Sequence, residues 1–102
     1  MSGVPLDWTA LQRDFGAGGE IPTVAGGKKL TITGVDEENV YIKHSLWRDR
    51  LAREHLEKAA RLVEEDAMTR HSGLFPEEYR TMVADVRATS VAHVLKYYGV
   101  LE

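Results

Sequence analysis

The stretch from Lys29 to Ala67 constrains the fold most, because two alternating segments lead directly into a long helical pattern. Residues 30–33 and 40–43 alternate apolar and polar side chains, with the period of two that a half-buried strand shows. The four polar residues 36–39 lie between these segments. The pattern therefore predicts an antiparallel hairpin over residues 29–46.

After the hairpin, apolar residues recur every three or four positions, which places them on one face of a helix. The stripe consists of Ala52, Leu56, Ala59, Ala60, Val63 and Ala67. The helix has two acceptable starts, one near residues 45–47 with Ser45 as N-cap, the other near Arg53 after a loop. We expect the stripe to cover the apolar face of the hairpin, which the alternation assigns to Leu30, Ile32, Val40, Ile42, His44 and Leu46.

Shorter elements flank this central unit. A helix is expected over residues 6–15, with Asp7 or Thr9 as N-cap and with Trp8 as a core residue. Residues 21–24 read as a short strand at a sheet edge, because Pro22 cannot donate to a ladder.

The C-terminal third predicts two more helices. One opens at Phe75-Pro76 and buries Tyr79, Met82, Val83 and Val86. A break near Thr89-Ser90 separates it from a last helix, which buries Val91, Val94, Leu95 and Tyr98 and is closed by Gly99.

These elements together predict one small α+β domain over residues 1–102. Its expected architecture is a two- or three-stranded antiparallel sheet with three to four helices packed on one side. An apolar content of 43% and a charged content of 28% are those of a folded globular chain.

The composition also limits localisation. The chain has no cysteine, which excludes a disulfide framework and thiolate metal sites and fits a reducing compartment. No apolar run is long enough to span a membrane, and the first residues lack the pattern of a signal peptide. We therefore expect a cytoplasmic protein with no membrane partner.

The sequence carries no enzyme signature. The four histidines, His44, His55, His71 and His93, include no pair at the helical spacing of a zinc site. Gly26-Gly27-Lys28-Lys29 fails as a phosphate-binding loop, since Pro22 occupies the first glycine position and a strand follows instead of a helix. We expect no catalytic residue, no metal and no cofactor.

Charged residues fall in blocks, and the basic block supplies the candidate binding site. Acidic residues occupy the hairpin turn, whereas basic residues gather where the hairpin leads into the helix. One interpretation is a solvated surface with local ion pairs such as Glu54–Lys58 and Glu57–Arg61. The other is a recognition surface formed by Tyr41, Lys43, Trp47, Arg48, Arg50 and Arg53.

The favoured function is a non-enzymatic protein-interaction or accessory module. Its contact is expected along the second hairpin strand, residues 40–46, either with a partner protein or with a second copy of the chain. This strand is expected to be an open sheet edge on which Lys43 is the only charged residue, and open edges pair readily with another chain.

The alternative is a small nucleic-acid-binding domain that uses the basic junction. It would contact phosphates through Lys28, Lys29, Lys43, Arg48, Arg50 and Arg53, with Tyr41 or Trp47 stacking on bases. A helix-turn-helix is disfavoured, because the outward residues expected on the last helix, Ser90, His93, Lys96 and Tyr97, include one fixed positive charge. An enzyme assembled from residues distant in sequence ranks third.

Overall fold

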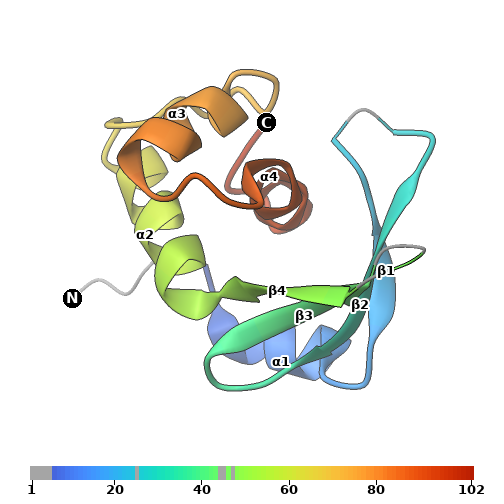
Figure 1. The fold of residues 1–102 in the computed structure, drawn as a ribbon. Coiled ribbons are helices and arrows are strands. Elements are labelled where there is room, and N and C mark those ends of the chain that lie inside the picture. The colour runs from blue at the N-terminus through green and yellow to red at the C-terminus, as the bar shows by residue number, and fades with distance from the viewer. Residues whose placement is uncertain (1–5, 25, 44–45, 47) are drawn as a thin grey trace.

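The chain folds into a four-stranded antiparallel sheet and four helices, so the predicted α+β class is confirmed (Figure 1). The computed structural model describes residues 6–24, 26–43, 46 and 48–102. The strands pair in the order β1-β2-β3-β4. The elements are α1 (Trp8–Phe15), β1 (Gly19–Pro22), β2 (Lys29–Val35), β3 (Asn39–Lys43), β4 (Arg48–Ala52), α2 (Arg53–Glu64), α3 (Phe75–Met82) and α4 (Ala88–Tyr97).

The fourth strand is the main departure from the prediction of two or three strands. β4 pairs antiparallel with β3 and leads directly into α2, so the helix begins at Arg53, the later of the two expected starts. The alternation in β4 is hidden because its inward positions hold Asp49 and Leu51, one charged and one apolar residue. Because β4 covers it, the second hairpin strand is not a sheet edge, and the expectation of an open edge over residues 40–46 is wrong.

The hairpin itself forms as expected, but its second strand is shorter. Ile32 lies opposite Ile42, and the register shifts between Ile32 and Gly34. β3 ends at Lys43, and Leu46 is 93% exposed, so its expected place in the core is wrong. His44, Ser45 and Trp47 lie outside the described residues.

One apolar cluster joins the sheet to all four helices. Figure 1 shows α4 in the middle of the molecule, bounded by the curved sheet, by α2 and by α3. The inner face of the sheet contributes Ile21, Leu30, Ile32, Val40, Ile42 and Leu51 to this core. The helices contribute, among others, Trp8, Phe15, Leu56, Val63, Phe75, Tyr79, Val91 and Leu95.

Several helix details confirm or correct the sequence prediction. Asp7 caps α1 by accepting a hydrogen bond from Ala10 N–H. A break between the last two helices is confirmed, but it lies at residues 83–87 and not at Thr89-Ser90, which belong to the first turn of α4. Because α3 ends at Met82, Met82 is 38% and Val86 is 52% exposed instead of buried. α2 ends at Glu64, and beyond it Met68 is buried in place of Ala67.

The described helices are short, and α2 is 12 residues long. Within the described part of the chain, none combines the length and the apolar content that a membrane crossing requires.

Candidate functional site

The outer face of the β3–β4 pair brings together four of the six residues predicted to bind a partner. Tyr41 lies opposite Arg50, and Lys43 lies opposite Arg48. Side chains directly opposite each other on antiparallel strands are about 5 Å apart at their Cβ atoms. Lys43, Arg48 and Arg50 are exposed and Tyr41 is half-buried, so this face presents three cations around one aromatic ring.

Tyr41 is held in place by the hairpin turn. Its hydroxyl donates to Asp36 Oδ2 at 2.6 Å, and this hydrogen bond raises the pKa of Tyr41 above its ordinary value. The same bond, together with the backbone N–H groups of Glu38 and Asn39, lowers the pKa of Asp36. The ring of Tyr41 remains on the outer face, but its hydroxyl already has a partner.

Arg53, the fifth candidate, belongs to a different environment. Its guanidinium donates to Glu57 Oε2 at 3.0 Å and to the Glu37 carbonyl at 3.1 Å, and it lies 5.2 Å from the centre of the Trp8 ring. Arg53 is therefore engaged by the fold and does not join the basic face. Glu57 pairs with Arg53 and not with Arg61, so the ion pair expected between Glu57 and Arg61 is wrong.

The sixth candidate, Trp47, lies outside the described residues. Lys28 and Lys29, which the nucleic-acid interpretation added, lie at the beginning of β2, on the far side of β3 from Arg48 and Arg50. They line a separate cavity.

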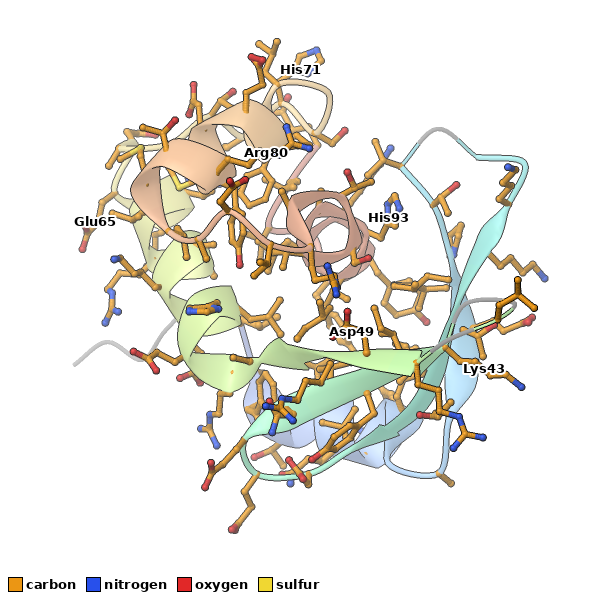
Figure 2. The ribbon with its side chains drawn as sticks, viewed as in Figure 1. Lys43, Asp49, Glu65, His71, Arg80 and His93 are labelled. Atoms are coloured by element: carbon orange, nitrogen blue, oxygen red, sulfur yellow. The ribbon has the colours of Figure 1, made fainter. Side chains whose placement is uncertain are left out.

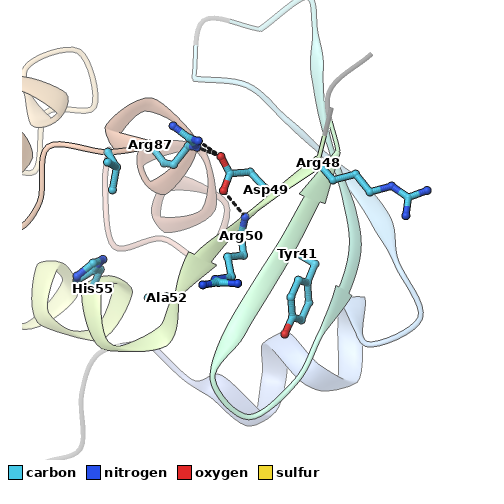
Figure 3. Close-up of a pocket in the computed structure, with 8 residues that line it drawn as sticks. Tyr41, Arg48, Asp49, Arg50, Ala52, His55 and Arg87 are labelled. Atoms are coloured by element: carbon cyan, nitrogen blue, oxygen red, sulfur yellow. Dashed lines mark hydrogen bonds and ion pairs between the residues drawn. The ribbon is translucent and has the colours of Figure 1, made fainter. Parts of the chain in front are cut away.

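A groove of about 540 Å³ runs beside β4, and we call it the β4 groove (Figure 3). It lies between the strand, the first turn of α2 and the segment before α4. It is lined by Tyr41, Arg48, Asp49, Arg50, Ala52, His55, Val86 and Arg87.

Asp49 and Arg87 close one wall of the β4 groove. The Asp49 carboxylate forms an ion pair with the Arg87 guanidinium through Oδ2, and its Oδ1 accepts a hydrogen bond from Arg50 N–H at 2.8 Å. Arg87 precedes α4 with a backbone φ of 57°, in the left-handed region that few non-glycine residues adopt. The sequence analysis missed both residues, since one lies in an unexpected strand and the other in a loop 38 residues away.

The open side of β4 also presents backbone groups. Arg53 N–H donates to the Glu38 carbonyl at 2.8 Å, which fixes the side of the strand that faces β3. Because hydrogen-bonding direction alternates along a strand, the backbone groups of Arg48, Arg50 and Ala52 turn to the open side. Among the described strands, none pairs with that side.

The arrangement offers main-chain hydrogen bonds and exposed cations. Across the described residues, no three or more His, Asp or Glu side chains are grouped so that they could hold a metal ion. The chain matches no protein-family model, no curated protein and no solved structure at a significant level.

Proposed function

We propose that this chain is a non-enzymatic interaction module that binds an extended, acidic segment of a partner protein along the open edge of β4. The observation that carries the proposal is the coincidence of an edge strand, a groove beside it and two exposed arginines on it. The proposal keeps the interaction module inferred from sequence and moves the contact from the second hairpin strand to β4.

Strand addition accounts for the backbone geometry. An extended peptide that adds to a sheet edge gains affinity from main-chain hydrogen bonds and specificity from alternate side chains. Ala52 N–H and the Arg50 carbonyl face the open side and are available for such a ladder. The Arg50 N–H group already donates to Asp49 Oδ1, so it is not available to a partner. The added strand would pair with the backbone groups on either side of it.

Charge favours an acidic partner over a second copy of the chain. Arg48 and Arg50 are exposed, and neither takes part in the ion pairs of the described chain. An antiparallel pairing of two β4 strands centred on Arg50 would set two arginines directly opposite each other, which is unfavourable. A partner strand with Glu or Asp at alternate positions removes that repulsion.

Substituting Ala52 with proline tests the edge directly. Ala52 has φ of −71°, which proline adopts without strain, and its N–H does not face β3. Ala52→Pro should therefore keep the fold and remove one main-chain donor from the open side. We expect about a ten-fold or greater loss of affinity for an alternating Glu-Val peptide of about eight residues, measured by NMR titration.

Two controls accompany this variant. Ala52→Ser keeps the N–H and should bind the Glu-Val peptide as the native chain does. A matched Lys-Val peptide should bind less tightly, because Arg48 and Arg50 repel it. Equal affinity of the proline and serine variants, or no perturbation of the β4 amides by the acidic peptide, would contradict strand addition.

The nucleic-acid interpretation remains the second candidate, because Lys43, Arg48 and Arg50 share the outer face with the Tyr41 ring. Three points weigh against it: Arg53 is engaged by Glu57, the Tyr41 hydroxyl is bound to Asp36, and the chain carries a net charge of −3. Phosphate contacts would make binding fall steeply with salt. Tight oligonucleotide binding at physiological salt that is lost on replacing Arg48 and Arg50 with Gln would reverse the order of the two candidates.

A further inference from the structure

A second cavity lies where β3 stops and β2 continues. β3 ends at Lys43, opposite Thr31, whereas β2 extends back to Lys29. Beside this end of the sheet, next to the beginning of α4, is a space of about 670 Å³ that we call the lysine cavity. Figure 2 shows His93 extending from α4 on one side of this region and Lys43 at the end of β3 on the other.

The rim of the lysine cavity is basic. Lys28, Lys29 and Lys43 are exposed and line it, and no Asp or Glu is among its lining residues. None of the three lysines belongs to an ion pair of the described chain. The register places Glu20 opposite Thr31, as the carboxylate beside this part of β2. A concave surface with several cations of one sign attracts anions.

A hydroxyl group from a largely buried residue opens into the same cavity. Ser90 lines the cavity with 8% of its surface exposed, and its side chain makes no hydrogen bond with any described residue. Among the described residues, no enclosed side-chain nitrogen or oxygen atom lacks a hydrogen-bond partner, so the Ser90 hydroxyl reaches the open space of the cavity. A ligand oxygen in the cavity could accept a hydrogen bond from it.

The first turn of α4 adds further donors. Ser90 is the third residue of α4, and the first N–H groups of a helix have no acceptor within it. The N-cap residue, Arg87, provides no side-chain hydrogen bond to them. Thr89 of the same turn also lines the cavity. A negatively charged group at this position would bind the free N–H groups and the positive end of the helix dipole.

His93 contributes an uncharged N–H donor whose orientation is fixed by a hydrogen bond to the other ring nitrogen. Its Nδ1 accepts a hydrogen bond from Val24 N–H at 3.0 Å, so in the neutral ring the proton resides on Nε2. Burial lowers the pKa of His93, which favours this neutral form. The sequence analysis expected Ser90 and His93 to point to solvent, and the structure places both in the wall of the cavity instead.

We propose that the lysine cavity binds the phosphate group of a small sugar phosphate. Ser90 and the first turn of α4 donate to the phosphate oxygens. The three lysines add positive charge from the rim, where Lys29 and Lys43 leave the outer face of the sheet. The volume of the lysine cavity lies in the range of about 300–1,000 Å³ that is usual for small-ligand sites. The lining provides hydroxyl groups but no Phe, Tyr or Trp, so it suits a sugar phosphate better than a nucleobase, which needs a stacking surface.

This site is independent of the β4 groove, because the two share no lining residue. The test is an NMR titration of the full chain with ribose 5-phosphate, with ribose, and with sodium chloride at matched ionic strength. We expect ribose 5-phosphate to produce saturable shifts of the Lys29, Thr89 and Ser90 amides. Ribose and chloride should not. Inorganic phosphate should produce the same shifts with lower affinity.

Two variants separate a built site from diffuse attraction. Replacing Lys28 and Lys29 together with Gln should weaken ribose 5-phosphate binding about ten-fold or more, since each charge-assisted hydrogen bond is strong. Ser90→Ala, a change that a helix tolerates well, should weaken it about three-fold or more. Replacing Lys58 and Arg61 with Gln is the charge-matched control, because both are exposed on α2, and it should leave affinity unchanged.

Three results would overturn the proposal. One is a change in chemical shift that rises linearly with the concentration of ribose 5-phosphate and that sodium chloride reproduces. Another is a native affinity in Ser90→Ala once circular dichroism shows that the variant is folded. The third is a single-stranded oligonucleotide that shifts the same amides and is not displaced by ribose 5-phosphate, which would make the cavity part of a nucleic-acid surface.

Discussion

The two ends of the β2–β3 hairpin use their polar residues in opposite ways. At the turn, Asp36 accepts hydrogen bonds from Glu38 N–H, from Asn39 N–H and from the Tyr41 hydroxyl, and its carbonyl accepts Trp8 Nε1–H at 2.7 Å. Arg53 completes this end by binding Glu57. At the other end, Lys29, Lys43 and the adjoining Arg48 take part in no ion pair of the described chain.

The contrast indicates where binding is to be sought. Polar groups at the turn are satisfied within the chain, so they stabilise the hairpin and offer little to a partner. Lys43 and Arg48 instead lie directly opposite each other, and like charges in that arrangement destabilise a sheet. Residues that lower the stability of a fold, and that no favourable contact compensates, are frequent at functional sites. The lysine cavity lies at this second end, and the proposed β4 edge starts there, at Arg48, and runs toward Ala52, opposite Asn39.

The largest effect is expected at the turn. Trp8 is 4% exposed, donates to the Asp36 carbonyl and lies against Arg53. Trp8→Ala removes a buried aromatic side chain together with this hydrogen bond, and it should lower the free energy of unfolding by about 3–5 kcal/mol. Urea denaturation followed by circular dichroism measures the change.

Trp8→Phe divides this effect into two parts. It retains most of the packing and loses the indole N–H, so it should cost about 1 kcal/mol. Lys58→Ala, on the exposed side of α2, should stay within about 0.5 kcal/mol of the native chain. If Trp8→Ala behaved like Lys58→Ala, the turn would not be the anchored end.

The second effect is a pH dependence that originates at Asp36. Hydrogen bonds from Tyr41 and from two backbone N–H groups keep the pKa of Asp36 below its ordinary value. The unfolded chain therefore binds the proton more readily than the folded chain. The contribution of Asp36 to stability is complete above its unfolded pKa and is lost as the pH falls through its lower folded pKa.

Asp36→Asn is the matching variant, because an amide keeps the shape but cannot titrate. Its denaturation midpoint should be lower than that of the native chain at pH 7, and the difference should shrink as the pH falls below about 4. Tyr41→Phe removes the largest cause of the shift and should reduce the same difference in part. A constant difference between the Asp36→Asn variant and the native chain at all pH values would show that Asp36 is not the group responsible.

Much of the fold could be predicted from periodicity alone. The alternation over residues 30–33 and 40–43 and the stripe of Leu56, Ala60 and Val63 formed as expected, and a break separates α3 from α4, although it lies at residues 83–87. These features are local, since each depends on residues a few positions apart. Trp8 was also recognised as a core residue, because its spacing from Leu11 and Phe15 is helical.

The parts that could not be predicted depend on tertiary contacts. β4 has one inward apolar residue, Leu51, and its other inward position holds Asp49, whose partner Arg87 is far away in sequence. Ser90 and His93 were assigned to solvent, but α4 lies in the middle of the molecule. A central helix has little free surface, so polar residues on its apparent outer face can become cavity walls.

The smallest expected effect has the opposite sign and lies at the basic end. Arg48→Glu replaces a like-charged pair opposite Lys43 with an attractive one, so stability should rise by about 0.2–1 kcal/mol. The same change should weaken binding of the acidic Glu-Val peptide, because it reverses a charge on the proposed β4 edge. Arg48→Gln removes the repulsion without adding an attraction, and it should fall between the native chain and Arg48→Glu in both measurements. A gain in stability coupled to a loss of binding is the result expected where charge serves recognition. If Arg48→Glu instead destabilised the chain, Arg48 would have a structural role like that of Arg53, and the contrast between the two ends would fail.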